Sequence, residues 1–299
     1  MNKFSTTSGA TQHPLFSVLI ANYNNGRYLQ EAIDSVLSQT YTNWEVIIVD
    51  DGSTDHSPEV YARYQSDPRF HIYYNERNRG CGYTKRRCAE LANGDICGFL
   101  DADDELLPAA LTLHTEAHLA NPKIALVFSR SRHYDEEGNA VGECAPIVLE
   151  DGETILSHKD KAAWNFSSYS NELYHKTEGI SAKLQAGVDQ DLYFKLEEVG
   201  EVKTIDAFTY KYNHRNDKAI TNQTVKLWYW NMVALKDAYL RRGLNPDTEM
   251  YEYWERVVAS LESDAAYRKE LEIRNTTTYR LGRALMTPAR LVKKLFSHE

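Results

Sequence analysis

The sequence predicts an α/β protein with a mostly parallel sheet flanked by helices, followed by a helical C-terminal extension. Short apolar runs alternate with helical patterns through the first 130 residues, which is typical of repeated strand–helix units. The run from Trp44 to Val49 is almost entirely apolar, as expected for a parallel strand buried on both faces. After about residue 221 the pattern is helical and rich in Tyr and Trp.

The predicted elements follow one another in regular order. Strands are predicted at 16–20, 44–49, 70–74, 96–100 and 124–128, and helices at about 28–37, 57–65, 83–92, 108–119 and 190–199. Ser57-Pro58 supplies a capping residue and a first-turn proline to the second helix, and Asn93-Gly94 ends the third. The stretch 131–178 shows no regular pattern.

Composition narrows the class of protein. The net charge of -9 argues against a nucleic-acid partner, although residues 273–298 carry six Lys or Arg and no Asp or Glu. None of the four cysteines forms a C-x-x-C pair, which argues against zinc. Residues 1–13 are polar and are expected to be disordered, without a signal peptide, and no apolar run is long enough to span a membrane. These features predict a cytoplasmic protein.

Polar, mostly acidic groups follow four consecutive predicted strands. They are Ala21-Asn22-Tyr23-Asn24, Asp50-Asp51-Gly52-Ser53, Asn75 to Gly80, and Asp101-Ala102-Asp103-Asp104. Ligands of open α/β sheets bind at the carboxyl ends of the strands. A tyrosine face for a base, basic groups for phosphate and carboxylates for a hard cation together suit a sugar nucleotide with Mg²⁺ or Mn²⁺.

Other nucleotide-binding classes fit less well. The chain has no G-x-x-x-x-G-K-[ST] loop and no G-x-G-x-x-G after the first strand, which argues against a P-loop NTPase and a dinucleotide-binding dehydrogenase. Two alternatives stay open. One is a sugar-1-phosphate nucleotidyltransferase, which would need a Gly-rich loop after the first strand, and the other is a non-catalytic sugar-nucleotide-binding protein.

Three segments resemble the family 2 glycosyltransferases of GT-A fold, which have a Rossmann-like sheet. They are FSVLIANYNNGRYLQEAIDSVLSQTYTNWEVIIVDDGSTD, GDICGFLDADDELLP and AGVDQDLYFKLEEVG. The resemblance covers about 14–221 and implies a nucleotide-binding half at about 14–130 and an acceptor half at about 131–221. Residues 222–299 would form the helical extension with its basic tail.

The resemblance implies a role for each matching residue. Ala21 and Tyr23 would hold the base, Tyr23 by stacking, and Asp51 would hydrogen-bond a base such as uracil. Asp101 would lie near the ribose, and Asp103 would bind the metal. Asp104 and Glu105 are expected at a solvated or metal-proximal rim.

Basic residues and the general base complete the implied site. Arg79 and Lys85 would add positive charge at the diphosphate, with Lys85 standing where the family usually has arginine. His214 is a further candidate for the diphosphate or the metal, with a surface histidine as the alternative. Residues two apart on a helix point to different faces, so Asp189 and Asp191 cannot both serve the acceptor. Asp189 matches the family position and is favoured as general base, whereas Asp191 would favour the helix dipole in the first turn.

The activity implied is inverting transfer of a sugar from a nucleotide-diphosphate donor, most simply a UDP-sugar, to an acceptor hydroxyl. The acceptor would be a glycan or lipid-linked saccharide of cell-surface polysaccharide synthesis. The basic tail at 273–298 would either lie on the inner face of the cytoplasmic membrane or pack on its own domain or on a second subunit of a homodimer.

Overall fold

The structure of the protein is a computed structural model that describes residues 13–158, 166–214, 224–246 and 250. Almost all of the predicted disordered N-terminus and the whole basic tail lie outside these residues. The chain divides into two compact units, Met1–Ala182 with Lys195–Arg215, and Lys183–Phe194 with Asn216–Glu299. Each unit is described by itself.

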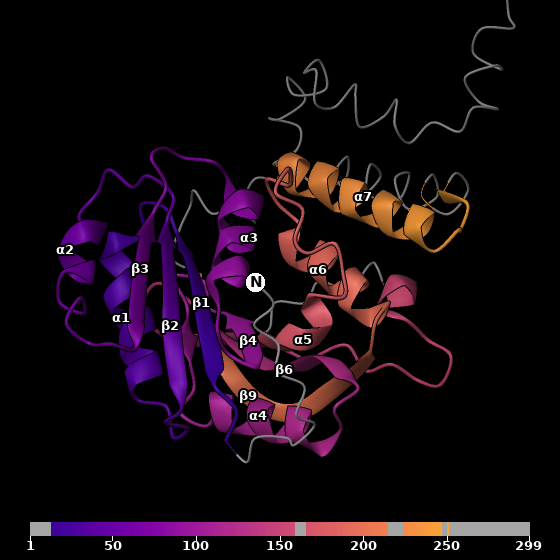
Figure 1. Ribbon diagram of the computed structural model, residues 1–299, viewed down its shortest axis with the longest axis horizontal. Helices are drawn as coiled ribbons and strands as arrows, with labels where there is room; N and C mark the ends of the chain where they lie inside the picture. Colours follow the sequence, from indigo (N-terminus) through magenta and orange to yellow (C-terminus); the bar gives the residue numbers. More distant parts are fainter. Residues whose placement is uncertain (1–12, 159–165, 215–223, 247–249, 251–299) are drawn as a thin grey trace, which may run out of the picture. The chain divides into compact units, whose positions relative to one another are not determined.

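The first unit is built on a nine-stranded sheet in the order β3-β2-β1-β4-β8-β6-β9-β5, with β7 paired to β6 (Figure 1). Four parallel strands form its N-terminal half: β1 (Phe16–Asn22), β2 (Trp44–Asp50), β3 (Phe70–Tyr74) and β4 (Ile96–Phe99). Every residue of β2 is buried, as its apolar run predicts. This half confirms the predicted α/β class.

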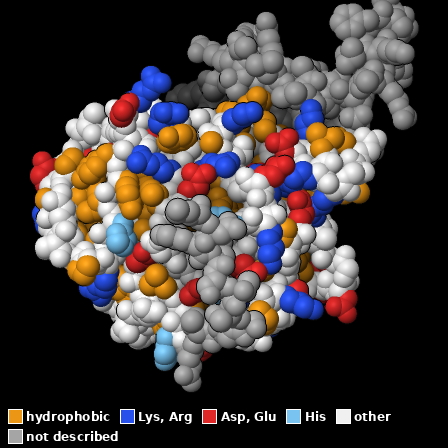
Figure 2. All heavy atoms as spheres, in the orientation of Figure 1, with side chains coloured by type: hydrophobic (Ala, Val, Ile, Leu, Met, Phe, Trp, Pro, Cys, Tyr) orange, Lys and Arg blue, Asp and Glu red, His pale blue; other side chains and the backbone are white. Residues whose placement is uncertain are grey.

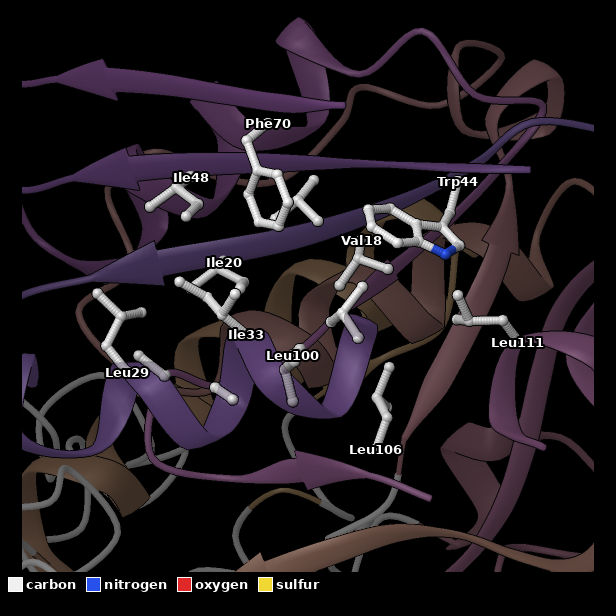
Figure 3. Packing of buried hydrophobic residues seen from close by; sticks show 14 of the residues in the cluster. Val18, Ile20, Leu29, Ile33, Trp44, Ile48, Phe70, Leu100, Leu106 and Leu111 are labelled. Carbon is white, nitrogen blue, oxygen red and sulfur yellow. The ribbon is translucent and has the colours of Figure 1, made fainter. Parts of the chain in front are cut away.

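Helices cover both faces of the sheet (Figure 1). The bounds are α1 (Gly26–Leu37), α2 (Ser57–Tyr61), α3 (Cys81–Leu91), α4 (Ala110–Ala120) and α5 (Asn171–Tyr174). The apolar stripe of α1, with Leu29 and Ile33, packs on Val18, Ile20 and Ile48 of the sheet (Figure 3). Contacts of α3 with β1 and β2 cover the opposite face.

The other half of the sheet is mixed. It contains β5 (Glu105–Leu106), β6 (Ile124–Tyr134), β7 (Ala140–Cys144), β8 (Ser167–Ser170) and β9 (Glu201–Asn213). β9 runs parallel to β6, whereas β5, β7 and β8 pair antiparallel to their neighbours. The sequence predicted only the first part of β6, so the sheet is larger and less parallel than expected. The described part of this unit also contains a short 3₁₀ helix at Ile155–His158.

The second unit contains the first seven residues of α6 (Val188–Glu197) and the whole of α7 (Thr224–Arg241). The Arg242 guanidinium donates to the carbonyl of Phe194 at 3.1 Å, which ties the residue just after α7 to α6. A search of the described helices found none with the length and apolarity needed to cross a bilayer.

Charged side chains of both signs are interspersed on the face drawn in Figure 2. Among the described residues of that face, Lys and Arg therefore form no continuous basic stripe of the kind that follows a nucleic-acid backbone.

A buried histidine pair predicts how stability depends on pH. His114 bonds Ser168 and Ser129 at 2.7 and 3.1 Å, and His118 bonds Ser168 at 3.0 Å. Burial lowers the pKa of His114 to about 3, with a further contribution from His118, and burial lowers that of His118 to about 4. Both rings are therefore neutral in the folded protein at pH 7.

The unfolded chain should bind these two protons near pH 6.5, well above the pH at which the folded protein does. Stability from the neutral rings is complete above pH 6.5 and falls as pH drops toward 4, by about 1.4 kcal/mol per unit for each histidine. Urea unfolding measures the free energy of unfolding at each pH. Between pH 6 and 4.5 this free energy should fall less steeply in His118→Gln than in wild type, by the slope that corresponds to one proton, about 1.4 kcal/mol per pH unit. Equal slopes for variant and wild type in that window would contradict the expectation, and above pH 7.5 the slopes should coincide.

Candidate active site

The carboxyl ends of β1, β2 and β3 lie level with one another. Asn22 of β1 pairs with Asp50 of β2, and Asp50 pairs with Tyr74 of β3. The backbone continues this register, because Asp51 N–H donates to the Asn22 carbonyl and Asn75 N–H donates to the Asp50 carbonyl, both at 2.8 Å. The polar groups that follow these strands in the sequence therefore meet at one edge of the sheet, as predicted.

Asp51 organises the loop that follows β3. Its carboxylate accepts from Arg79 N–H at 2.8 Å, Gly80 N–H at 2.8 Å and Asn75 Nδ2 at 2.7 Å. The residue is only 3% exposed. A carboxylate offers about four acceptor positions, so these bonds leave about one for a ligand. Asp51 thus has a structural role that the sequence did not reveal, alongside its predicted contact with a base.

Asp51→Ala should destabilise the protein by about 2–3 kcal/mol, because it leaves the buried donors of Asn75 and of the Arg79–Gly80 backbone without an acceptor. Urea unfolding measures this, with Glu76→Ala on the same loop as an exposed control. A loss no larger than that of the control would show that water replaces the carboxylate.

Tyr23 and Arg79 present groups suited to a nucleotide. Tyr23 follows β1 with 46% of its surface exposed, so a ring face is open to stacking, and Ala21 precedes it at the end of β1. The Arg79 guanidinium lies over the Tyr83 ring at 4.2 Å and has no carboxylate partner among the described residues. A cation held by stacking and left without a counter-ion is suited to a phosphate.

Lys85 faces the end of β4. Its ammonium is 3.2 Å from Asp101 Oδ1 and 5.1 Å from the centre of the Phe99 ring. The Lys85 side chain is 7% exposed, whereas that of Asp101 is 51% exposed. The structure thus brings these two predicted residues together, so Lys85 offsets the charge of the acidic turn.

The acidic turn 101–105 divides into buried and accessible carboxylates. Asp104 is 3% exposed and accepts from Tyr210 Oη and Asn213 N–H, both at 2.7 Å. Burial raises the pKa of Asp104 well above its usual range, and Asp103 and Asp101 raise it further. A solvated position for Asp104 is therefore wrong: the pairing of β5 with β9 pulls its side chain inward.

Glu105 is also engaged, because Lys211 Nζ donates to it at 2.7 Å. Asp101 is exposed and shared with Lys85, and Asp103 is half-buried, so neither is enclosed as Asp104 is. Among the described residues, no three His, Cys, Asp or Glu side chains lie close enough to hold a metal ion by themselves. This donor set fits a Mg²⁺ or Mn²⁺ bound through one or two carboxylates and completed by substrate phosphates.

His214 immediately follows Asn213 at the end of β9. Its exposed ring lies 3.3 Å from His133, Nε2 to Nδ1, and the His214 N–H donates to the Tyr134 carbonyl at 2.8 Å. Burial lowers the pKa of His133, and His214 lowers it further. The residue seen to contact the acidic turn is Asn213, which precedes His214 in the chain, rather than His214 itself.

Asp189 and Asp191 both lie in the first turn of α6, in the second unit. The other predicted site residues lie in the first unit, so the position of the general base relative to them stays a prediction. Sequence reasoning missed Tyr210 and Asn213. The only signal for them was the polar–aromatic run TYKYNH, which shows no motif.

The sheet order and the strand-end site first define the class of fold: an α/β protein that gathers polar groups at the carboxyl ends of its parallel strands. A family model, glycosyl transferase family 2, matches residues 17–176. The chain therefore belongs to glycosyltransferase family 2, and this membership leaves the nucleotidyltransferase alternative without support.

Individual relatives agree with this assignment. Chondroitin synthase of Escherichia coli is 32% identical over 66% of this chain, and the match spans only 28% of that protein. The structure of S. aureus TarS in complex with UDP has a TM-score of 0.60 at 18% identity and covers 94% and 77% of the two chains. A mannosyltransferase from Pyrobaculum calidifontis, in complex with GDP-Man and Mn²⁺, gives 0.58 at 16% identity, with coverage of 97% and 89%. The two structures support the GT-A fold.

Proposed function

We propose that this protein transfers a sugar, with inversion, from a nucleoside-diphosphate donor to an acceptor hydroxyl. The observation that carries the proposal is the gathering at one sheet edge of a stackable tyrosine, an acidic turn, and an arginine with no carboxylate partner in the described part of the chain. Tyr23 would stack on the base, and Asp51 would accept its N–H at the remaining carboxylate position. Asp101 would lie toward the ribose.

The diphosphate would lie between Arg79 and the acidic turn. Arg79 would stabilise the charge that grows on the departing diphosphate, and Lys85 would hold Asp101 in place while adding to the positive field. A divalent cation bound at Asp103, with His214 as a further candidate ligand, would supply additional positive charge to the same group. Asp189 would remove the acceptor proton as the hydroxyl attacks the anomeric carbon.

The base and the acceptor are proposed from chemistry and from the relatives. TarS binds UDP and the mannosyltransferase binds GDP-Man with Mn²⁺, so both uracil and guanine occur on this fold. We favour UDP for this chain. The chondroitin synthase match supports a saccharide acceptor in polysaccharide synthesis, with residues 14–221 as the catalytic domain. We also propose that the protein acts at the inner face of the cytoplasmic membrane.

Thermal unfolding with a panel of nucleotides tests the proposal. UDP-sugars with MnCl₂ should raise the melting temperature, because a ligand that binds only the folded state stabilises it by mass action. At a hundred times the dissociation constant the gain is about 2.7 kcal/mol. Stabilisation by GDP-sugars alone would overturn the choice of uracil, and no stabilisation by any nucleotide would overturn the function.

A further inference from the structure

Asn213, the last residue of β9, is fastened to the acidic turn by three hydrogen bonds. Its backbone N–H donates to Asp104 Oδ1 at 2.7 Å. Its side-chain Nδ2 donates to the Asp103 carbonyl at 3.1 Å and to Glu105 Oε1 at 3.3 Å. One residue therefore contacts three consecutive members of the turn that carries the proposed cation ligand.

These partners fix which way the Asn213 amide points. Both neighbours of Nδ2 are oxygen acceptors, so exchanging the amide nitrogen and oxygen would place oxygen against oxygen. The remaining atom, Asn213 Oδ1, is buried and has no hydrogen-bond partner among the residues that the structure describes, and the residue as a whole is 4% exposed. Buried carbonyl oxygens are nearly always paired, and an orphan calls for an explanation such as an ion or an ordered water.

The position of Asn213 Oδ1 distinguishes it from the other buried side-chain atoms that lack a hydrogen-bond partner among the described residues. Six further buried side-chain atoms among the described residues also lack a partner, so the orphan oxygen alone indicates no ligand. The Asn213 oxygen, however, belongs to an amide whose nitrogen is already bound to the backbone of Asp103. The amide is thus held at the acidic turn, and the residue that carries it contacts the carboxylates of Asp104 and Glu105.

We propose that Asn213 Oδ1 is an oxygen ligand of the divalent cation that Asp103 binds. Mg²⁺ and Mn²⁺ prefer hard oxygen donors, and a side-chain amide carbonyl is one of them. The same amide would then do two things: its nitrogen sets the backbone of Asp103, and its oxygen completes the cation shell. This assignment rests on the proposed function and adds a neutral ligand to it.

Two matched variants separate the ligand from its positioning role. Asn213→Ala and Asn213→Cys lose the same amide, but only the second offers an atom that can bind a metal, and thiolate favours Cd²⁺ over Mg²⁺ or Mn²⁺. The affinity for UDP is measured calorimetrically with saturating MnCl₂, with CdCl₂, and in EDTA. With Mn²⁺ both variants should bind UDP about 10-fold or more weakly. With Cd²⁺, Asn213→Cys should bind about 10-fold more tightly than Asn213→Ala.

The EDTA arm shows whether the nucleotide site is intact, since UDP affinity without a cation should be unchanged in both variants. Equal affinities of the two variants with Cd²⁺ would overturn the ligand role and leave Asn213 as a positioning residue. Unchanged affinity of Asn213→Ala with Mn²⁺ would overturn the whole assignment.

The wild-type protein provides an independent test in case both variants fail to fold. With asparagine labelled with ¹³C at Cγ, electron–nuclear double resonance of bound Mn²⁺ with UDP should show a ¹³C coupling of directly ligated strength. Its absence from a sample that binds Mn²⁺ and UDP would refute the assignment. If the wild-type protein binds no Mn²⁺ with either UDP or GDP, the proposed function is overturned, and with it the assignment of Asn213 Oδ1 as a cation ligand.

Discussion

Asp103→Ala should lower Mn²⁺-dependent hydrolysis of the preferred nucleotide sugar by roughly 10²–10³-fold, the size expected when stabilisation of a departing charge is lost. Asp103 is a carboxylate of the turn that is not drawn into the core, unlike its neighbour Asp104. Slow hydrolysis by water in the absence of acceptor provides the assay. It requires no knowledge of the acceptor.

The control for Asp103 is Glu116→Gln, which removes an exposed charge on α4 and should leave hydrolysis unchanged. Melting temperatures in EDTA check that both variants are folded. If Asp103→Ala hydrolyses the nucleotide sugar at the wild-type rate, Asp103 does not bind the cation, and the proposed site loses its basis.

Asp189→Asn should lower kcat of sugar transfer by about 10²–10⁴-fold while leaving donor affinity unchanged, since a general base acts on the acceptor proton. Asparagine keeps the size and polarity of the side chain and removes only its ability to take a proton. Transfer kinetics with the acceptor, together with thermal stabilisation by the donor alone, separate these two effects.

Asp191→Asn is the matched change two residues along α6. Asp191 is 1% exposed, so the change is expected to lower the melting temperature, whereas kcat of the folded protein should stay within about threefold of wild type. A large loss in Asp191→Asn with little change in Asp189→Asn would exchange the two assignments.

Much of the N-terminal, parallel half of the sheet follows from sequence patterns alone. The apolar runs of β1 to β4 and the amphipathic spacing of α1 each bury a continuous apolar surface, so periodicity locates them closely. The strand-end positions of Tyr23, Asp51 and Asp103 follow directly, because parallel strands bring their carboxyl ends to one edge.

The other half of the sheet carries weaker signals. β8 is made of Ser and Tyr, and its buried Ser168 is satisfied by His114 and His118 rather than by apolar packing. β9 shifts register against β6 more than once, including between Arg130 and Ser131, and this breaks the alternation of its side chains. β7 is mostly exposed and depends on pairing with β6. Such strands are specified by their partners, which no local pattern reports.

The sequence by itself determined the family, the parallel half of the sheet and the places where polar groups would gather. Only the tertiary structure decided which carboxylate of the acidic turn is buried. Asp103 and Asp104 are adjacent in the chain, yet β9 buries Asp104 against Tyr210 and leaves Asp103 with its backbone fixed by Asn213. The physical reason is that the cost of burying a carboxylate depends on the donors that distant segments provide, and those donors are brought together only by folding.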